Sequence, residues 1–270
     1  MENEEDKRFQ EKRLSKRIIY GPIRSRRLEN SLGVNLMPEK EKLCSFDCVY
    51  CECGFSSSDA DPQDLILHDS QTILNVLEAK LKELKAEHAT IDSITFSGNG
   101  EPTLHTEFPK IIDGVISLRN EYYPKTKITV LSNATTIIKP SVVEALRRID
   151  SPVLKLDSAV TATMRAIDMP HSSLFNSEDL IDELMKFGGN VIIQTILISG
   201  YYNGIAFDNT ADEEVSAYIE ALRRINPRMV MLYALDRKAP VETLRKVSAD
   251  ELNKVADKIR KLGIDVVVAG

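Results

Sequence analysis

Residues 42–54 read KLCSFDCVYCECG and contain all four cysteines of this 270-residue chain. Cys44, Cys48 and Cys51 follow one another with the spacing C-x3-C-x2-C, and Cys53 comes two residues later. Thiols this close in sequence cannot join distant parts of a fold, as structural disulfides do. The spacing instead lets three thiolates project from one short loop toward a common point, which indicates a metal site.

An iron-sulfur cluster fits this loop better than a zinc ion. Structural zinc sites usually combine two pairs of Cys or His that are separated by a longer spacer. The chain has no second cysteine pair, and its four histidines show no metal-ligand spacing. A cluster accepts thiolates from close positions, and three ligands leave one iron open to an exogenous chelator. A non-catalytic, zinc-stabilised binding protein remains the alternative from a different class.

The rest of the chain has the pattern of an α/β protein. Short runs of β-branched residues predict strands at 33–37, 91–97, 127–132, 152–157, 190–199, 228–235 and 264–268. Between them, apolar residues repeat at helical spacing, as from Ile73 to Leu84, and Ser248 with Glu251 forms a capping box before another helix. Such alternation indicates βα units around a parallel sheet. Six or seven strands are too few to close an eight-stranded barrel, so we expect an open, partial barrel.

The composition bounds the class of protein. Hydrophobic residues make up 43% of the chain and charged residues 28%, which is typical of a globular domain. The net charge of -6 excludes a global positive field, so an RNA partner would need a local basic patch. No apolar run reaches the ~20 residues of a membrane span or forms a signal peptide, so we expect a cytoplasmic protein without a membrane partner. We expect residues 1–17 to form a charged arm or helix, and residues 18–270 to form the core domain with a short C-terminal βα extension.

Tyr50 stands directly before the third cysteine, and with it the motif resembles that of the radical S-adenosylmethionine (SAM) superfamily. Three later segments carry the resemblance further. ITFSGNGEPTLH at 94–105 resembles the glycine-glycine-glutamate segment of that family, with Asn99 departing from the first glycine. VLSNAT at 130–135 and VLKLDSA at 153–159 place polar residues at strand ends, where barrels build their sites. The resemblance covers about residues 18–268.

Within the superfamily, residues 20–54 look like the branch related to wyosine tRNA synthetases, many of whose bacterial members have no assigned substrate. Those synthetases add a second cluster from further cysteines. Cys53 is the one spare cysteine in this chain, which excludes a second thiolate-bound cluster. We therefore leave Cys53 out of the predicted ligands.

The resemblance implies a partial (βα)6 barrel of the radical SAM type and an oxygen-sensitive enzyme with a 4Fe-4S cluster on Cys44, Cys48 and Cys51. SAM would chelate the open iron, and one electron from a donor such as flavodoxin or ferredoxin would cleave it to a 5'-deoxyadenosyl radical that abstracts a substrate hydrogen. Ser132 and Asn133 would hold the ribose, although they could also form a local turn or cap the helix near Pro140. The candidate cofactor-binding residues are Tyr50, Gly98, Asn99, Gly100, Glu101, Ser132, Asn133, Asp157 and Gln194.

The substrate is less well specified than the cofactors. Arg24, Arg26 and Arg27 form the one concentrated basic loop, which we expect at the barrel rim, where guanidinium groups could bind phosphate or carboxylate. The candidate substrate-binding residues are Arg24, Arg26, Arg27, Asn35 and Lys155. The substrate is predicted to be an RNA base, a small metabolite or a peptide. Activation of a glycyl-radical enzyme is the alternative, and it would require a large protein partner.

Overall fold

The computed structural model describes residues 14–25, 29–236 and 239–270. Eight strands form the central sheet in the order β1-β2-β3-β4-β5-β6-β9-β11. All neighbours pair in parallel except β1, which lies antiparallel to β2. The strands span Ile19–Ser25 (β1), Glu29–Val34 (β2), Ser93–Phe96 (β3), Lys127–Ser132 (β4), Ser151–Lys155 (β5), Ile192–Ile196 (β6), Met229–Tyr233 (β9) and Asp265–Ala269 (β11).

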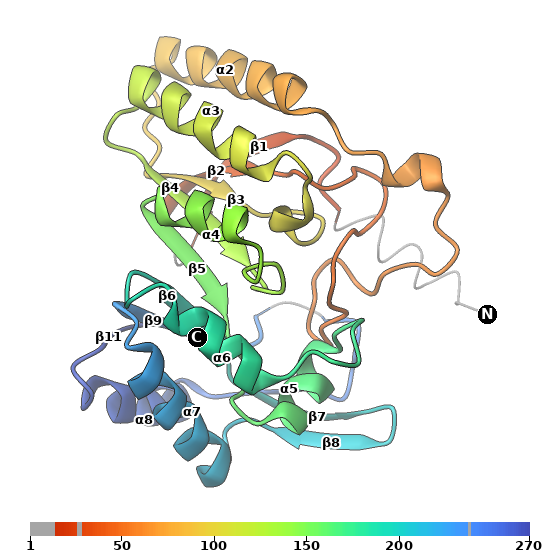
Figure 1. The fold of residues 1–270 in the computed structure, drawn as a ribbon, viewed down its shortest axis with the longest axis vertical. Coiled ribbons are helices and arrows are strands. Elements are labelled where there is room, and N and C mark those ends of the chain that lie inside the picture. The colour runs from red at the N-terminus through yellow and green to blue at the C-terminus, as the bar shows by residue number, and fades with distance from the viewer. Residues whose placement is uncertain (1–13, 26–28, 237–238) are drawn as a thin grey trace.

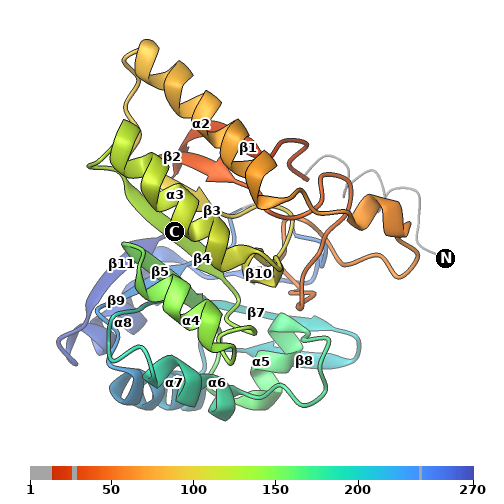
Figure 2. The same cartoon turned by 45° about the horizontal axis from the view of Figure 1, so that its top comes forward.

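Six parallel strands are each followed by at least one helix, and β11 ends the chain, so the predicted partial (βα)6 barrel is confirmed. The helices lie along the outer face of the curled sheet, with α2, α3 and α4 beside one half and α6, α7 and α8 beside the other (Figures 1 and 2). They span Ser70–Ala86 (α2), Phe108–Tyr122 (α3), Pro140–Arg147 (α4), Thr161–Asp168 (α5), Ser177–Met185 (α6), Asp212–Ile225 (α7) and Ala249–Arg260 (α8).

The strand predicted at 190–199 is wrong, because two strands replace it. β6 ends at Ile196, and β7 (Ile198–Tyr202) turns away to pair with β8 (Ile205–Asp208) and with the short β10 (Arg245–Lys246). Asn209 fixes the break: its side chain accepts a hydrogen bond from the Ile198 amide at 2.8 Å and donates one to the Ile196 carbonyl at 2.7 Å. The apolar run continues through the break, so its pattern did not reveal it.

The two faces of the sheet differ in chemistry. Leu154 and Leu156 join the large apolar core on the helix side of the sheet, because alternate residues of a strand share a face. The inner face carries a smaller apolar cluster around Val153, with Ile192 and Met231. Beside it, buried hydroxyls on β2, β3 and β4 hydrogen-bond to one another across the strands. Several of these inner-face residues, among them Thr129, Ile192 and Met231, line a cavity of the half-barrel.

None of the helices in the described ranges is both long enough and apolar enough to cross a bilayer.

Candidate functional site

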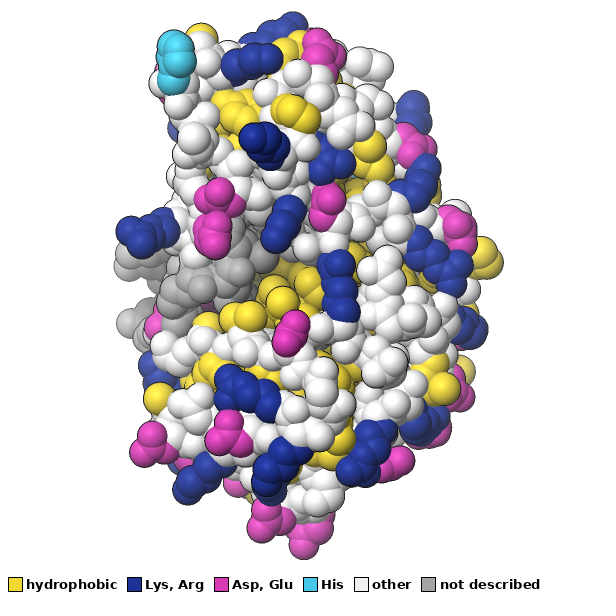
Figure 3. All heavy atoms as spheres, turned by 90° about the vertical axis from the view of Figure 1, so that its left-hand side faces the viewer, with side chains coloured by type: hydrophobic (Ala, Val, Ile, Leu, Met, Phe, Trp, Pro, Cys, Tyr) yellow, Lys and Arg dark blue, Asp and Glu magenta, His cyan; other side chains and the backbone are white. Residues whose placement is uncertain are grey.

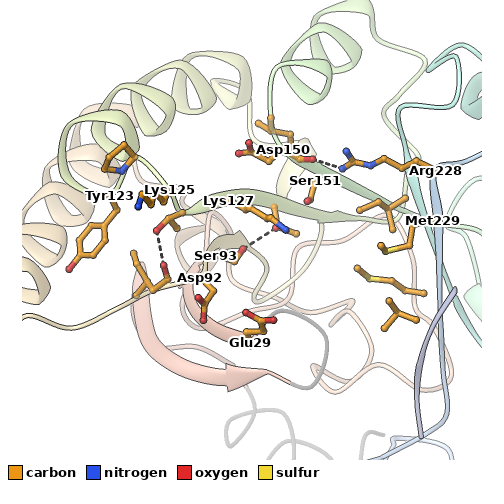
Figure 4. A pocket seen from close by; sticks show the side chains of 18 of the residues that line it. Glu29, Asp92, Ser93, Tyr123, Lys125, Lys127, Asp150, Ser151, Arg228 and Met229 are labelled. Atoms are coloured by element: carbon orange, nitrogen blue, oxygen red, sulfur yellow. Dashed lines mark hydrogen bonds between the residues drawn. The ribbon is translucent and has the colours of Figure 1, made fainter. Parts of the chain in front are cut away.

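The two ends of the half-barrel carry different cavities. The larger cavity, about 1190 Å³, lies at the amino-terminal strand ends, where a hollow with hydrophobic side chains is visible from that side (Figure 3). Its lining mixes hydroxyl groups with charged side chains, of which Arg228 donates to the Asp150 carbonyl (Figure 4). Asp92 accepts from the Asn30 amide at 3.0 Å. No cysteine is among the described residues that line it.

The cysteines line a second cavity, of about 150 Å³, at the carboxyl-terminal strand ends. This position is the one that βα barrels use for chemistry. The structure brings most of the predicted site residues together there, on segments that lie far apart in the sequence. The lining residues are Lys42, Cys44, Phe46, Cys48, Tyr50, Cys51, Cys53, Gly98, Gly100, Glu101, Leu131, Ser132, Asn133, Lys155 and Gln194.

Backbone hydrogen bonds anchor the cysteine loop to neighbouring segments. The Leu43 amide donates to the Asn99 carbonyl at 3.0 Å, and the Glu101 amide donates to the Leu43 carbonyl at 3.0 Å. At the other end of the loop, the Val49 amide donates to the Ile167 carbonyl at 2.9 Å. Gly100 allows both hydrogen bonds of Leu43, because a Cβ at position 100 would lie 1.8 Å from the Leu43 carbonyl oxygen. The glycine is therefore required for packing against the loop, a role that the sequence pattern did not reveal.

Asp47 fastens the same loop through its side chain, and sequence reasoning missed it. Its carboxylate accepts from Lys42 Nζ at 2.9 Å, from the Ser56 amide at 2.7 Å and from His171 Nε2 at 2.9 Å. Burial raises the pKa of Asp47, but Lys42 and the other donors outweigh this effect and hold the pKa below its ordinary value. Lys42 is 5% exposed and also donates to the Gly54 carbonyl at 2.9 Å. In the sequence, the signals of these two roles were an acidic residue between Cys44 and Cys48 and a lysine just before Cys44.

Glu101 joins the loops that follow β3 and β4. The buried carboxylate accepts from the Thr103 amide at 3.0 Å, from Ser132 Oγ at 2.8 Å and from the Asn133 amide at 2.6 Å. Burial raises the pKa of Glu101, although these donors oppose the rise. Ser132 Oγ also accepts a hydrogen bond from the Ala134 amide at 3.0 Å. Ser132 therefore both forms a local turn and lines the cavity.

Three predicted site residues, Asn35, Asn99 and Asp157, lie behind the cavity rather than in it. Asn35 and Asn99 are 2% and 1% exposed, and neither is among the residues that line the cavity. Asn35 Oδ1 accepts from the Asn99 amide at 3.1 Å, and Asn99 Nδ2 donates to the Pro38 carbonyl at 2.7 Å and to the Ser15 carbonyl at 2.8 Å. The side chain of Asn35 thus braces the 98–101 segment, and its contact with a substrate stays a prediction.

Lys155 is buried among groups of the protein. Its Nζ lies 3.0 Å from Cys48 Sγ, 2.6 Å from the Tyr50 hydroxyl and 3.1 Å from Asp168 Oδ1. An ammonium group has three donors, and these contacts occupy them; Lys155 nevertheless lines the cavity, and its contact with a substrate stays a prediction. The Tyr50 hydroxyl in turn donates to Asp157, which lies behind the cavity lining. Asp168, at the end of α5, was missed because the sequence does not show which way a helix end points.

Arg24, the one described member of the arginine loop, is not at the cysteine site. Arg24 is exposed and pairs with Asn30 at the start of β2, which is the amino-terminal end of that strand. Glu29, beside it, lines the larger cavity. Arg26 and Arg27 lie outside the described residues, as does most of the predicted 1–17 arm. The structure thus places Arg24 beside the amino-terminal end of β2 and not near the cysteines, while its contact with a substrate stays a prediction.

The cysteine thiols differ in their electrostatics. A hydrogen bond from Cys53 is the main cause that lowers the pKa of Cys51, to about 6, whereas burial raises the pKa of Cys44 to about 11. Cys53 thus favours the thiolate form of Cys51, which is a predicted ligand. The Sγ of Cys53 itself lies 3.4 Å from the Gly98 carbonyl oxygen. Asn133 Nδ2 approaches Cys44 Sγ at 3.5 Å.

The donor set fits an iron-sulfur cluster. Three cysteines from one loop line a single cavity, and thiolates are the ligands that such clusters use. Within the described ranges, no three Cys, His, Asp or Glu side chains are grouped so that they could hold one metal ion. A cluster spreads its thiolate ligands over several irons, so it does not need them grouped around a single ion.

The half-barrel and the cysteine loop at its carboxyl end define the class of radical SAM proteins, and comparison with known families agrees. The family model for the Radical SAM superfamily matches residues 42–213, so this chain belongs to that superfamily. The resemblance predicted from the sequence is confirmed, and the chain is a radical SAM enzyme. Membership supports SAM-dependent radical chemistry.

Individual relatives extend this result. A UPF0026 protein of Helicobacter pylori strain J99 is 30% identical over 243 residues, which cover 88% of this chain and 72% of that protein. A radical SAM methyltransferase from Sphaerobacter thermophilus has the same fold, with a TM-score of 0.64 at 16% identity, covering 88% of this chain and 65% of that one. TYW1 with a lysine-pyruvate adduct bound is similar too, with a TM-score of 0.60 at 15% identity, over 87% of this chain and 74% of that one. This chain thus spans slightly less than two thirds of the methyltransferase.

Proposed function

We propose that this enzyme holds a 4Fe-4S cluster on Cys44, Cys48 and Cys51 and uses it to cleave SAM and to abstract a hydrogen atom from a substrate. The observation that carries the proposal is the placement of these three thiols in one cavity with Glu101 and Asn133. When bound, the cluster would supply the electron for reductive cleavage of SAM. The same donor set and the family membership weigh against a non-catalytic zinc protein.

The residues around the thiols would bind the rest of SAM. The 98–100 segment offers backbone carbonyls, and Glu101 offers a carboxylate, to the amino group of the methionine moiety. Its Oε2 accepts one bond from the Asn133 amide and keeps acceptor capacity toward the cavity. Phe46 and Leu131 supply apolar wall, which excludes water from a reactive radical.

The charge around the cavity favours a small metabolite or a peptide as substrate over an RNA base. The cations among the described residues that line the cavity are Lys42 and Lys155, and both are bound to acids of the protein. With Arg24 at the opposite end, the described lining offers no free cation to a phosphate backbone. A one-electron donor such as flavodoxin or ferredoxin would complete the reaction. Activation of a glycyl-radical enzyme remains the alternative, with a protein partner in place of the small substrate.

The test begins with anaerobic reconstitution with iron and sulfide. Metal and sulfide analysis comes first, followed by reduction and incubation with SAM and detection of 5'-deoxyadenosine by chromatography. We expect near-equal iron and sulfide, and 5'-deoxyadenosine above an unreduced control. Stoichiometric zinc in place of iron would refute the proposal.

Two cysteine variants make a matched pair for this test. We expect Cys48→Ala to lose the normal cluster, because it removes one of three ligands. We expect Cys53→Ala to keep a full complement of iron, although Cys53 lines the same cavity. A normal cluster in Cys48→Ala would remove Cys48 from the ligand set, and iron loss in Cys53→Ala would add Cys53 to it.

A further inference from the structure

A buried cation touches one of the proposed cluster ligands. Lys155 is 8% exposed, and its Nζ lies 3.0 Å from Cys48 Sγ. The same nitrogen faces the rings of Tyr50 and Phe46, at 4.8 Å and 5.5 Å from their centroids. The ammonium group is therefore confined against the thiol by aromatic faces, which favour a cation.

Acidic partners keep this lysine charged. Asp168 Oδ1 lies 3.1 Å from Nζ, and Asp157 Oδ2 lies 3.4 Å from it. These two carboxylates and the two aromatic faces surround the ammonium group with partners that favour a cation, and they hold it in one position beside Cys48.

A fixed positive charge beside a thiolate ligand has a redox consequence. Reduction adds one negative charge to a cluster, and a nearby cation stabilises the more negative state. Hydrogen bonds to the sulfurs and local charge are among the properties that set cluster potentials. The effect is strong where water is excluded, because charges are poorly screened there.

We propose that Lys155 raises the reduction potential of the cluster by donating a charge-assisted hydrogen bond to Cys48. This inference rests on the proposed cluster. Lys155 acts through Cys48, so it is a positioning residue rather than a catalytic one. This role of Lys155 also gives a reason for the buried ion pair of Lys155 and Asp168 at the carboxyl end of β5.

The second buried lysine of the cavity lacks this contact. Lys42 Nζ donates to Asp47 Oδ1 and to the Gly54 carbonyl, so it fastens the loop. The two lysines therefore predict different defects: loss of Lys42 would loosen the loop and its metal, whereas loss of Lys155 would leave the metal bound and change its potential.

The test compares Lys155→Met, Lys155→Arg and Asp168→Asn with the wild type after anaerobic reconstitution. Iron and sulfide content is measured first, and an anaerobic redox titration then follows the reduced cluster by electron paramagnetic resonance. At the potential where half of the wild-type cluster is reduced, we expect Lys155→Met to show a ratio of reduced to oxidised cluster on the order of tenfold lower, which is a fall of about 59 mV for one electron. Asp168→Asn should shift the ratio in the opposite direction, because it leaves the cation less compensated, and Lys155→Arg should stay near the wild type.

Each result decides the matter. A Lys155→Met protein with full iron and an unchanged ratio overturns the inference while leaving the proposed function intact. If Lys155→Met does not fold or hold iron, Asp168→Asn decides instead, and an unchanged or lowered ratio there overturns the inference. A wild type that holds no iron and sulfide overturns the proposed function and this inference together.

Discussion

Gly100→Ala tests how the cysteine loop is held in place. Gly100 has a φ of +147°, and its Cα packs against the backbone of Leu43, the residue before Cys44. An alanine Cβ would lie 1.8 Å from the Leu43 carbonyl oxygen, so one backbone segment would have to move away. We expect the substitution to destabilise the fold and to impair iron binding, although it changes no thiol.

The expected cost follows from two contributions. A backbone conformation that favours glycine costs about 1–3 kcal/mol when another residue adopts it. Moving Leu43 away also breaks its two hydrogen bonds with Asn99 and Glu101, at about 0.5–1.5 kcal/mol each. Gly100→Ala should therefore lower the free energy of unfolding by about 2–6 kcal/mol.

Gly188→Ala is the matched control. Gly188 also has a positive φ, of +58°, but no heavy atom lies within 4 Å of the position of its Cβ, and it is far from the thiols in sequence. We expect this variant to lose only about 1–2 kcal/mol and to bind iron normally. Urea denaturation and iron analysis compare the two variants under anaerobic conditions. Equal stability losses with equal iron content would refute the argument that Gly100 is needed for contact with Leu43.

Three further outcomes follow from the fold. Leu77→Ala removes a fully buried side chain of α2 and should cost about 2–5 kcal/mol in urea denaturation, so a loss below 1 kcal/mol would contradict the core assignment. Ser248→Ala removes the N-cap of α8 and should cost about 1 kcal/mol, whereas Ser248→Thr should cost less. Glu107 has its pKa lowered to about 2, chiefly by the Ser70 amide. Because its folded pKa is depressed, its contribution is present above about pH 4.3 and disappears as the pH falls toward 2. The difference in Tm between wild type and Glu107→Gln should shrink over that range, and a constant difference would contradict this assignment.

The sequence predicted the architecture well because its information was local. Buried parallel strands appear as apolar runs. The helical stripe of Ile73, Leu77, Leu81 and Leu84 marks the buried face of α2, and each of these side chains is at most 2% exposed. The Ser248 and Glu251 capping box forms as expected. The β7–β8 hairpin was missed because the apolar pattern does not show that Asn209 interrupts the strand.

The site was predicted where a motif or a strand end marked it. Glu101, Ser132 and Asn133 meet in the cavity because each lies at or just after the end of a parallel strand. Arg24 was misplaced because charge density alone does not show which end of a strand a loop joins. The ion pair of Lys155 was missed because its acidic partner Asp168 is contributed by a separate helix, which no spacing along the chain connects to it.

The hydrogen bonds that hold the cysteine loop come largely from its backbone, with Asp47 as the main side-chain contribution. This feature predicts how the protein can change during evolution. Substitutions at positions such as Ser45 leave the main-chain contacts intact, but an insertion between Cys44 and Cys51 would shift the register of all of them. Gly54 and Ser56 still bond to Lys42 and Asp47, but residues 57–61, which form no helix or strand, carry no such constraint. Length differences among relatives should therefore accumulate after the cysteines and not between them.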